Sequence, residues 1–287
     1  MITAAFKTWI ANIRELLSNP VPLAIFAGLY ALLLATLFGF VSTREATLWQ
    51  VTVTLSFLVL IPAEFFILQS SIVRHTHDRK FHWRQILRDS TKIAIVTLPV
   101  ILIGYGLLLL LNKWAAHYPI TTAPLRVWPS PKALSAANKL PLQPLHWPTI
   151  LFGTAKGLLL GIVLPLASIH LWIEVSSDQV SALFGGGARG VLNRLGRVLS
   201  RAFGSTSVFV YALGLLVFAL IPYAILFVNI SSKGTRGDFA IFIARLLLVF
   251  VFSLFGWIVT VSSLSQMNAE TEPVTHREMS APAEAAA

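Results

Sequence analysis

The sequence has no cysteine and few charged residues. Of its 287 residues, only 12% are Asp, Glu, Lys or Arg, whereas 56% are hydrophobic. Soluble domains carry about a quarter charged residues, so this composition, with its mean hydropathy of +0.75, is typical of a membrane protein. The absence of cysteine excludes disulfides, Cys-ligated zinc, iron–sulfur clusters and thiol catalysis.

Motifs for catalysis and cofactor binding are also missing. The chain has neither the His-Glu-x2-His helix of zinc proteases nor the Gly-x-Ser-x-Gly turn of serine hydrolases. The glycine-rich segment 185–190 lacks the Gly-Lys-Ser/Thr of a phosphate-binding loop, and we expect a flexible hinge there. His75, His77 and His82 lie close together, but the neighbouring cations oppose a metal ion. We therefore expect no enzyme, no cofactor and no metal.

Six apolar runs are long enough to cross the ~30 Å hydrocarbon core as helices. Backbone groups in lipid must bond internally, and runs of this length fit helices far better than barrel strands. The sequence therefore predicts an all-α integral membrane protein with six transmembrane helices in a membrane domain of residues 23–266. The predicted spans are 23–41, 48–73, 93–111, 149–173, 208–228 and 239–264.

The formal charge of +10 is distributed as the positive-inside rule describes. Thirteen of the 22 Lys and Arg residues lie in the termini and the second and fourth connections, and seven lie in the other three connections. We therefore expect both termini on the cytoplasmic side of a bacterial inner membrane. The charges lie in short stretches between apolar runs, which indicates a lipid surface as the partner and excludes nucleic acid.

Three segments outside the spans have distinct compositions. Residues 1–22 place apolar side chains at helical spacing between Lys7, Arg14 and Glu15, which predicts an amphipathic helix in the membrane interface. The outer loop 112–148 is rich in proline, so we expect irregular backbone that could contact a membrane or periplasmic protein partner. Residues 267–287 predict a disordered cytoplasmic tail.

The two basic connections combine positive charge with helical phasing, which indicates interfacial helices that contact anionic phospholipid headgroups. A topology signal alone is the other interpretation, although topology requires no helical phasing. The basic side chains are spaced by four in the first connection and at i, i+3 and i+7 in the second. They are Lys80, Arg84, Arg88 and Lys92, then Arg194, Arg197 and Arg201.

Within the spans, Glu64 is the deepest charge, and deep charges usually face the interior of a bundle. Lys156 and Arg245 either extend outward to the interface or turn inward towards Glu64, forming a polar site. A protonated Glu64 bonded to a Ser, a Thr or a backbone carbonyl is the structural alternative. Span four also carries Gly153, Gly157 and Gly161, whose spacing by four predicts close packing against another helix and a central position.

The segments His82–Arg88 and Arg189–Arg197 are both basic helices that lead into an apolar span. Each follows a span containing a hydrophobic residue before proline, namely Ile61-Pro62 and Leu164-Pro165. In this pattern the chain resembles the bacterial inner-membrane domain attached to some glycerophosphodiester phosphodiesterases and found in stand-alone proteins. The resemblance implies a helical membrane domain and no transferable site residue.

Two functions fit these features. The first is a non-enzymatic scaffold or accessory subunit that contacts anionic lipid through its basic helices. The second is a small-solute or proton-coupled transporter, or a permease subunit, with Glu64 at its polar centre.

The predicted topology can be tested with reporter fusions. A reporter fused at Lys92–Ile93 or at Ala287 should report cytoplasm, and one at Ser135 should report the exterior, because the basic connections stay inside. A cytoplasmic Ser135 would contradict the topology.

Overall fold

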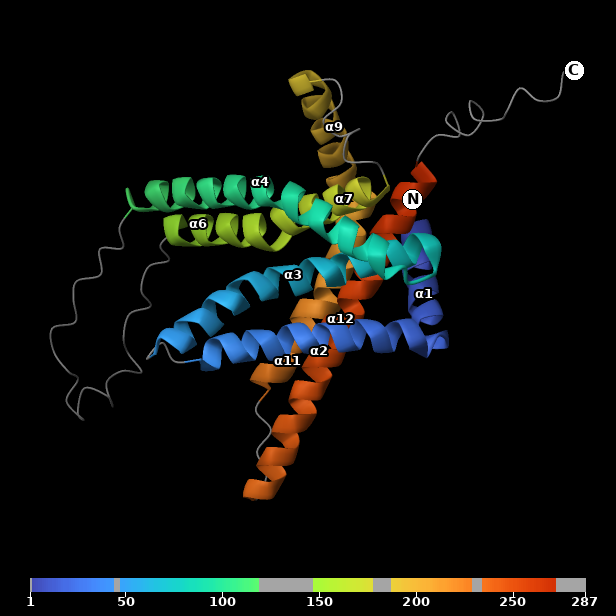
Figure 1. The fold of residues 1–287 in the computed structure, drawn as a ribbon. Coiled ribbons are helices and arrows are strands. Elements are labelled where there is room, and N and C mark those ends of the chain that lie inside the picture. Colours follow the sequence, from blue (N-terminus) through green and yellow to red (C-terminus); the bar gives the residue numbers. More distant parts are fainter. Residues whose placement is uncertain (1, 44–46, 119–146, 178–186, 229–233, 272–287) are drawn as a thin grey trace, which may run out of the picture. The chain divides into compact units, whose positions relative to one another are not determined.

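The computed structural model describes residues 2–43, 47–118, 147–177, 187–228 and 234–271, and all regular structure in these ranges is helical (Figure 1). The chain divides into two compact units, which are described separately. The larger unit comprises Met1–Leu98 with Leu166–Ala287, and the smaller one comprises Pro99–Pro165. Both boundaries fall at prolines inside helical stretches, where the ring removes a backbone hydrogen bond.

Six helical stretches in the described residues are long and apolar enough to cross a membrane, which confirms the all-α, multi-pass fold. They are α2 (Pro20–Ser42), α3 (Leu48–Asp78), α4 (Trp83–Ala115), α6 with η2 and α7 (Trp147–Leu158, Leu159–Val163, Leu164–Ser177), α10 with η3 and α11 (Ser205–Leu215, Leu216–Leu220, Ile221–Phe227), and α12 (Thr235–Thr271). Helices α1 (Ile2–Ser18) and α9 (Gly187–Ala202) lie outside these stretches.

The elements η2 and η3 are π-helical turns, and each comes just before a proline, Pro165 or Pro222. A proline ring clashes with the carbonyl four residues earlier. That carbonyl belongs here to Gly161 or Phe218, inside the π turn. The wider turn moves the carbonyl away from the ring, so the span continues as a helix.

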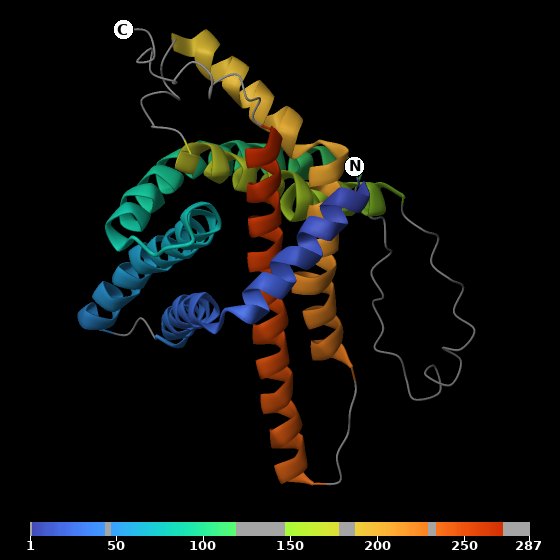
Figure 2. The same ribbon diagram turned by 90° about the vertical axis from the view of Figure 1, so that its right-hand side faces the viewer.

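Helix α12 is the element that the others in the larger unit share. It packs against α1, α2, α3, α10 and α11, and Figure 2 shows α1 lying across it. Ser263 of α12 accepts a hydrogen bond from Asn12 of α1 at 3.0 Å. Ser262 accepts one from Thr76 of α3 at 3.1 Å. Such interhelical hydrogen bonds and close packing hold helices together in lipid.

Glycines make the closest helix contacts, but they are not the glycines of span four. A Cβ atom at Gly214 of α10 would overlap the Thr260 side chain of α12, and one at Gly256 would lie 2.9 Å from the Phe218 backbone nitrogen. A Cβ at Gly153, Gly157 or Gly161 would meet nothing within 4 Å. Within the smaller unit an added methyl group would therefore be accommodated at these positions, and the packing of span four against another helix stays a prediction.

Several predicted boundaries also require correction. Helix α3 ends at Asp78 and α4 begins at Trp83, so Lys80 lies in the connection and is not on the helix that carries Arg84, Arg88 and Lys92. That helix is also the start of span three, not a separate interfacial helix. Residues 187–190, predicted as hinge, begin α9, and residues 267–271, predicted as tail, extend α12. The remainder of the hinge and of the tail, and most of the 112–148 loop, lie outside the described residues.

Helix α1 matches the predicted amphipathic segment in position, and its two sides differ. Ala5, Asn12 and Leu16 are buried on the side of α1 that packs against other helices of the larger unit. Phe6, Ile10 and Leu17 are exposed. Its location in the membrane interface stays a prediction.

Substituting Gly214 with Ala should destabilise the protein by about 1–3 kcal/mol, because the new methyl group overpacks the contact with Thr260. Gly157→Ala is the matched control and should cause no loss, since its Cβ enters open space and Ala is the better helix former. Thermal unfolding in detergent measures both changes. Equal effects of the two substitutions would contradict this account of the packing.

Candidate functional site

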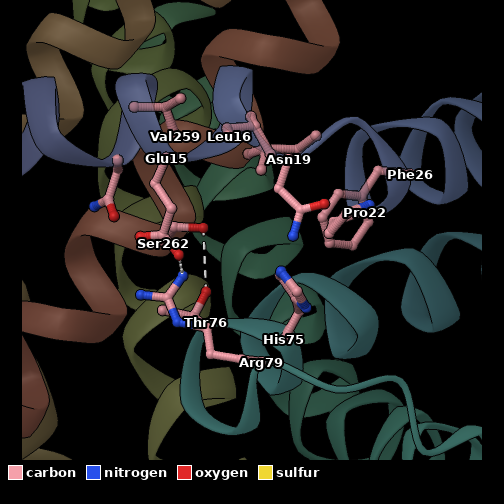
Figure 3. A pocket seen from close by; sticks show the side chains of 12 residues that line it. Glu15, Leu16, Asn19, Pro22, Phe26, His75, Thr76, Arg79, Val259 and Ser262 are labelled. Carbon is pink, nitrogen blue, oxygen red and sulfur yellow. Dashed lines mark hydrogen bonds and ion pairs between the residues drawn. The ribbon is translucent and has the colours of Figure 1, made fainter.

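The topology predicted from the sequence places helix α1, residues 79–82, α9 and the end of α12 on one side of the membrane. We call this side the basic end. A polar pocket lies there, between α1, the start of α2, the end of α3 and α12 (Figure 3). Its volume of about 40 Å³ has room for small polar groups or a few water molecules. The lining residues are Asn12, Glu15, Leu16, Asn19, Pro22, Phe26, His75, Thr76, Arg79, Ile258, Val259 and Ser262.

An ion pair between Arg79 and Glu15 forms the polar edge of this pocket. The two side chains are 48% and 44% exposed, so the pair is accessible to solvent and contributes less than about 1 kcal/mol. Arg79 is the C-cap of α3 and has a φ of 55°. This left-handed conformation costs a non-glycine residue roughly 1–2 kcal/mol, so glycine would be the more stable choice here.

The ring of His75 lies at the apolar edge of the pocket, and one of its nitrogen atoms faces the hollow. Its imidazole stacks on Phe81 at 4.9 Å between ring centroids and meets the edge of Phe26 at 5.7 Å. Its Nδ1 atom is buried and has no hydrogen-bond partner. In Figure 3 the amide of Asn19 and the His75 ring point towards each other. A buried polar atom without a partner is costly, so the Nδ1 atom of His75 is a candidate contact for a polar ligand.

A second hollow follows deeper in the larger unit, between α2, α3, η3 and α12. It has a volume of about 310 Å³, within the range of ligand pockets, and its lining is largely apolar. At one side Trp257 donates a hydrogen bond to Gln69 at 2.9 Å, and the Trp257 ring packs against Phe218. We call it the apolar groove. It is lined by Tyr30, Leu33, Phe65, Leu68, Gln69, Phe218, Ser253, Leu254 and Trp257.

The polar pocket and the apolar groove use the same three long helices. On α2, Phe26 lines the pocket and Tyr30 lines the groove, one helical turn apart. On α12, Ile258 and Leu254 are related in the same way. One turn corresponds to about 5.4 Å along a helix. The polar pocket and the apolar groove are thus neighbours along α2 and α12, one turn apart.

Beside the pocket lies a buried charge cluster that the sequence reasoning missed. Asp89 is only 1% exposed. Its carboxylate lies 3.0 Å from the Lys92 ammonium and 3.6 Å from the Arg74 guanidinium, and Arg74 also pairs with Asp78. Lys92, predicted to contact lipid headgroups, is therefore directed inward. In the sequence, the only sign of this ion pair is the spacing of Asp89 three residues before Lys92, which can bring the two side chains together on a helix. This spacing does not indicate that Arg74 joins them.

The remaining basic residues differ in their surroundings. Arg84, Arg88 and Arg197 are exposed, as lipid contact requires, and so is Lys80 in the connection. Arg201 instead pairs with Glu174 of α7 at 3.3 Å. The side chain of Arg194 lies outside the described residues.

The structure does not join Glu64 to Arg245. Glu64 is 8% exposed and accepts a hydrogen bond from Thr36 of α2 at 3.0 Å, which agrees with the structural alternative of a bond to a Thr. Its second oxygen, Oε2, is buried without a partner. Arg245 donates to the carbonyl of Val228 at the end of α11, where the helix dipole favours a cation. Lys156 lies on α6 in the smaller unit and is half-buried.

The histidines of the 75–82 segment diverge. His75 lines the pocket, His77 lies 3.2 Å from the hydroxyl of Ser265, and His82 is exposed before α4. Among the described residues no group of three His, Cys, Asp or Glu side chains could hold a metal ion.

Comparison with known proteins gives no match to a family model, a curated protein or a solved structure. The resemblance to the phosphodiesterase-associated membrane domain therefore stays a prediction.

Substituting Glu64 with Gln should change stability by less than about 1 kcal/mol, because the amide oxygen can accept the same hydrogen bond from Thr36. Thr36→Val removes that donor and should cost about 1–3 kcal/mol by leaving a buried carboxyl without a partner. Thermal unfolding in detergent measures both. A large loss for Glu64→Gln, rescued by neutralising Arg245 or Lys156, would indicate an ion pair instead.

Proposed function

We propose that this chain is a non-enzymatic multi-pass protein of the bacterial inner membrane. It acts as a scaffold or accessory subunit and contacts anionic phospholipid at its basic end. The observation that carries the proposal is the surface of the first two turns of α4. There Trp83 and Leu87 are 47% and 52% exposed, and Arg84 and Arg88 are exposed beside them. Apolar groups at the acyl boundary with cations at the phosphates are the pattern of an interfacial surface.

Two other segments of the basic end repeat this pattern. On α9, Leu195 and Leu199 are exposed together with Arg197. On α1, Phe6 and Ile10 are exposed close to Lys7. Each basic residue near an anionic surface contributes about 1 kcal/mol, so the segments together favour anionic lipid.

A small-solute or proton-coupled transporter is the second candidate. The buried Oε2 atom of Glu64 favours it, because a carboxylate oxygen without a partner in a span can receive a proton or a cation. Loss of a cellular phenotype in Glu64→Gln with stability retained would support transport over the scaffold.

The anionic-lipid surface can be tested with a double substitution. The protein extracted with its surrounding lipid should be enriched in phosphatidylglycerol and cardiolipin over the bulk membrane. Arg84→Gln with Arg88→Gln should lower that enrichment more than tenfold, because about 2 kcal/mol of attraction is removed. Raising the salt concentration should weaken the enrichment in the parent protein, since exposed charges are screened.

Lys113→Gln with Arg236→Gln is the matched control. Both residues are exposed, and they lie at the ends of α4 and α12 that are farthest from the basic end. It should leave the enrichment unchanged. If the Arg84 and Arg88 substitutions alter insertion alone and leave the lipid composition intact, these residues are a topology signal only.

A further inference from the structure

We infer that the polar pocket and the apolar groove together form one binding site for a single zwitterionic phospholipid. Such a lipid has a phosphate, an ammonium headgroup and acyl chains, as in phosphatidylethanolamine. This inference deepens the proposed function, but it concerns an internal site separate from the basic surface. The pocket offers charged groups and the neighbouring groove offers an apolar lining, which is the order of the charged head and the apolar tails in such a lipid.

The depth of each hollow matches the lipid. The pocket residues Phe26, His75 and Ser262 lie within six residues, roughly 9 Å, of the ends of their candidate spans, and we assign them to headgroup level. The groove residues Tyr30, Gln69 and Trp257 lie nine to eleven residues inside those ends, and we assign them to hydrocarbon depth. A headgroup whose charged groups contact Arg79 and Glu15 at the edge of the pocket therefore places an acyl chain at the level of the groove.

The charges of the pocket select a zwitterion. Arg79 and Glu15 pair with each other and leave the pocket edge neutral. A lipid phosphate can take the guanidinium of Arg79, which binds phosphate in a bidentate manner, while the lipid ammonium takes the carboxylate of Glu15. One exposed ion pair is thus exchanged for two, and no net charge is buried. A lipid with phosphate but no cation would leave Glu15 beside another anion, which is unfavourable.

The polar groups without partners fit the phosphate. The buried Nδ1 atom of His75 has no hydrogen-bond partner, and the ring faces the amide of Asn19 (Figure 3). Asn19 is the N-cap of α2, but its side chain makes no capping bond. Both groups can therefore serve a phosphate oxygen. Arg79 also occupies a left-handed backbone position at which glycine would be more stable, and a binding role for its side chain would explain an arginine there.

Native mass spectrometry of the full-length protein tests the inference. The protein is held in nanodiscs of equal phosphatidylethanolamine and phosphatidylglycerol, then released, and the retained lipid is identified. The parent protein should retain one phosphatidylethanolamine, about tenfold over phosphatidylglycerol, as one charge-assisted bond implies. Arg79→Gln should lower retention of either lipid about tenfold. Glu15→Gln should reverse the preference towards phosphatidylglycerol, because the carboxylate that repels it is gone.

Two controls separate this site from the basic surface and from misfolding. Arg84→Gln should leave the retained lipid unchanged, even where it lowers the enrichment of surrounding anionic lipid. Ser253→Phe fills the groove and should lower retention of the diacyl lipid, while binding of soluble phosphoethanolamine persists. Circular dichroism and thermal unfolding confirm that each variant is folded.

Equal retention of the two lipids by the parent protein would overturn the inference, as would an unchanged preference in Glu15→Gln. An unchanged diacyl retention in Ser253→Phe would overturn the role of the groove. Because Arg84 and Arg88 take no part in the pocket, failure of the anionic-lipid surface leaves these outcomes intact, and the two proposals can fail separately.

Discussion

Hydrogen bonds from α12 to its neighbours are the interactions on which the larger unit depends. In lipid, apolar side chains gain nothing by leaving one hydrocarbon surface for another, so helices associate through close packing and polar contacts. Ser262 and Ser263 meet α3 and α1, and Trp257 meets Gln69 of α3. Farther along, Gly214 and Gly256 let α10 and η3 approach α12 closely. Both hollows are lined by α12, so their shapes depend on these contacts.

Charge is arranged in two ways at the basic end. Asp89, Lys92 and Arg74 lie together and are largely shielded from solvent, and removing Asp89 would leave the Lys92 ammonium without its ionic partner. Arg84, Arg88 and Arg197 remain on the surface, where water and lipid headgroups can solvate them. Both groups satisfy the positive-inside rule equally well. The count of basic residues therefore orients the chain, but it does not tell a lipid contact from an internal ion pair.

The spans could be predicted from the sequence because length and apolarity act locally, one helix at a time. The partners of polar residues could not, because they depend on which faces meet. The spacing of Lys80 from Arg84 suggests that both lie on one helix. Arg79, however, ends α3 in a left-handed conformation, and the sequence gives no sign of this end because the residue is not a glycine. Gly214 belongs to no glycine motif, yet it closely approaches the Thr260 side chain of α12, because close approach depends on which helix faces meet. The sequence around His75 likewise does not indicate that its ring packs against Phe26 and Phe81.

The polarity of the two hollows bears on the choice between a lipid contact and transport. A path for a solute or a proton needs polar groups that continue through the hydrocarbon depth. Here polarity falls with depth, from Arg79 and Glu15 in the pocket to the aromatic and aliphatic lining of the groove. Glu64 lies one turn beyond Leu68 of the groove, but its hydrogen bond is made to Thr36. A gradient from charged to apolar over two helical turns suits a molecule that is itself charged at one end and apolar at the other. This gradient is the reason why we propose a lipid, and not a small polar solute, as the ligand of the two hollows.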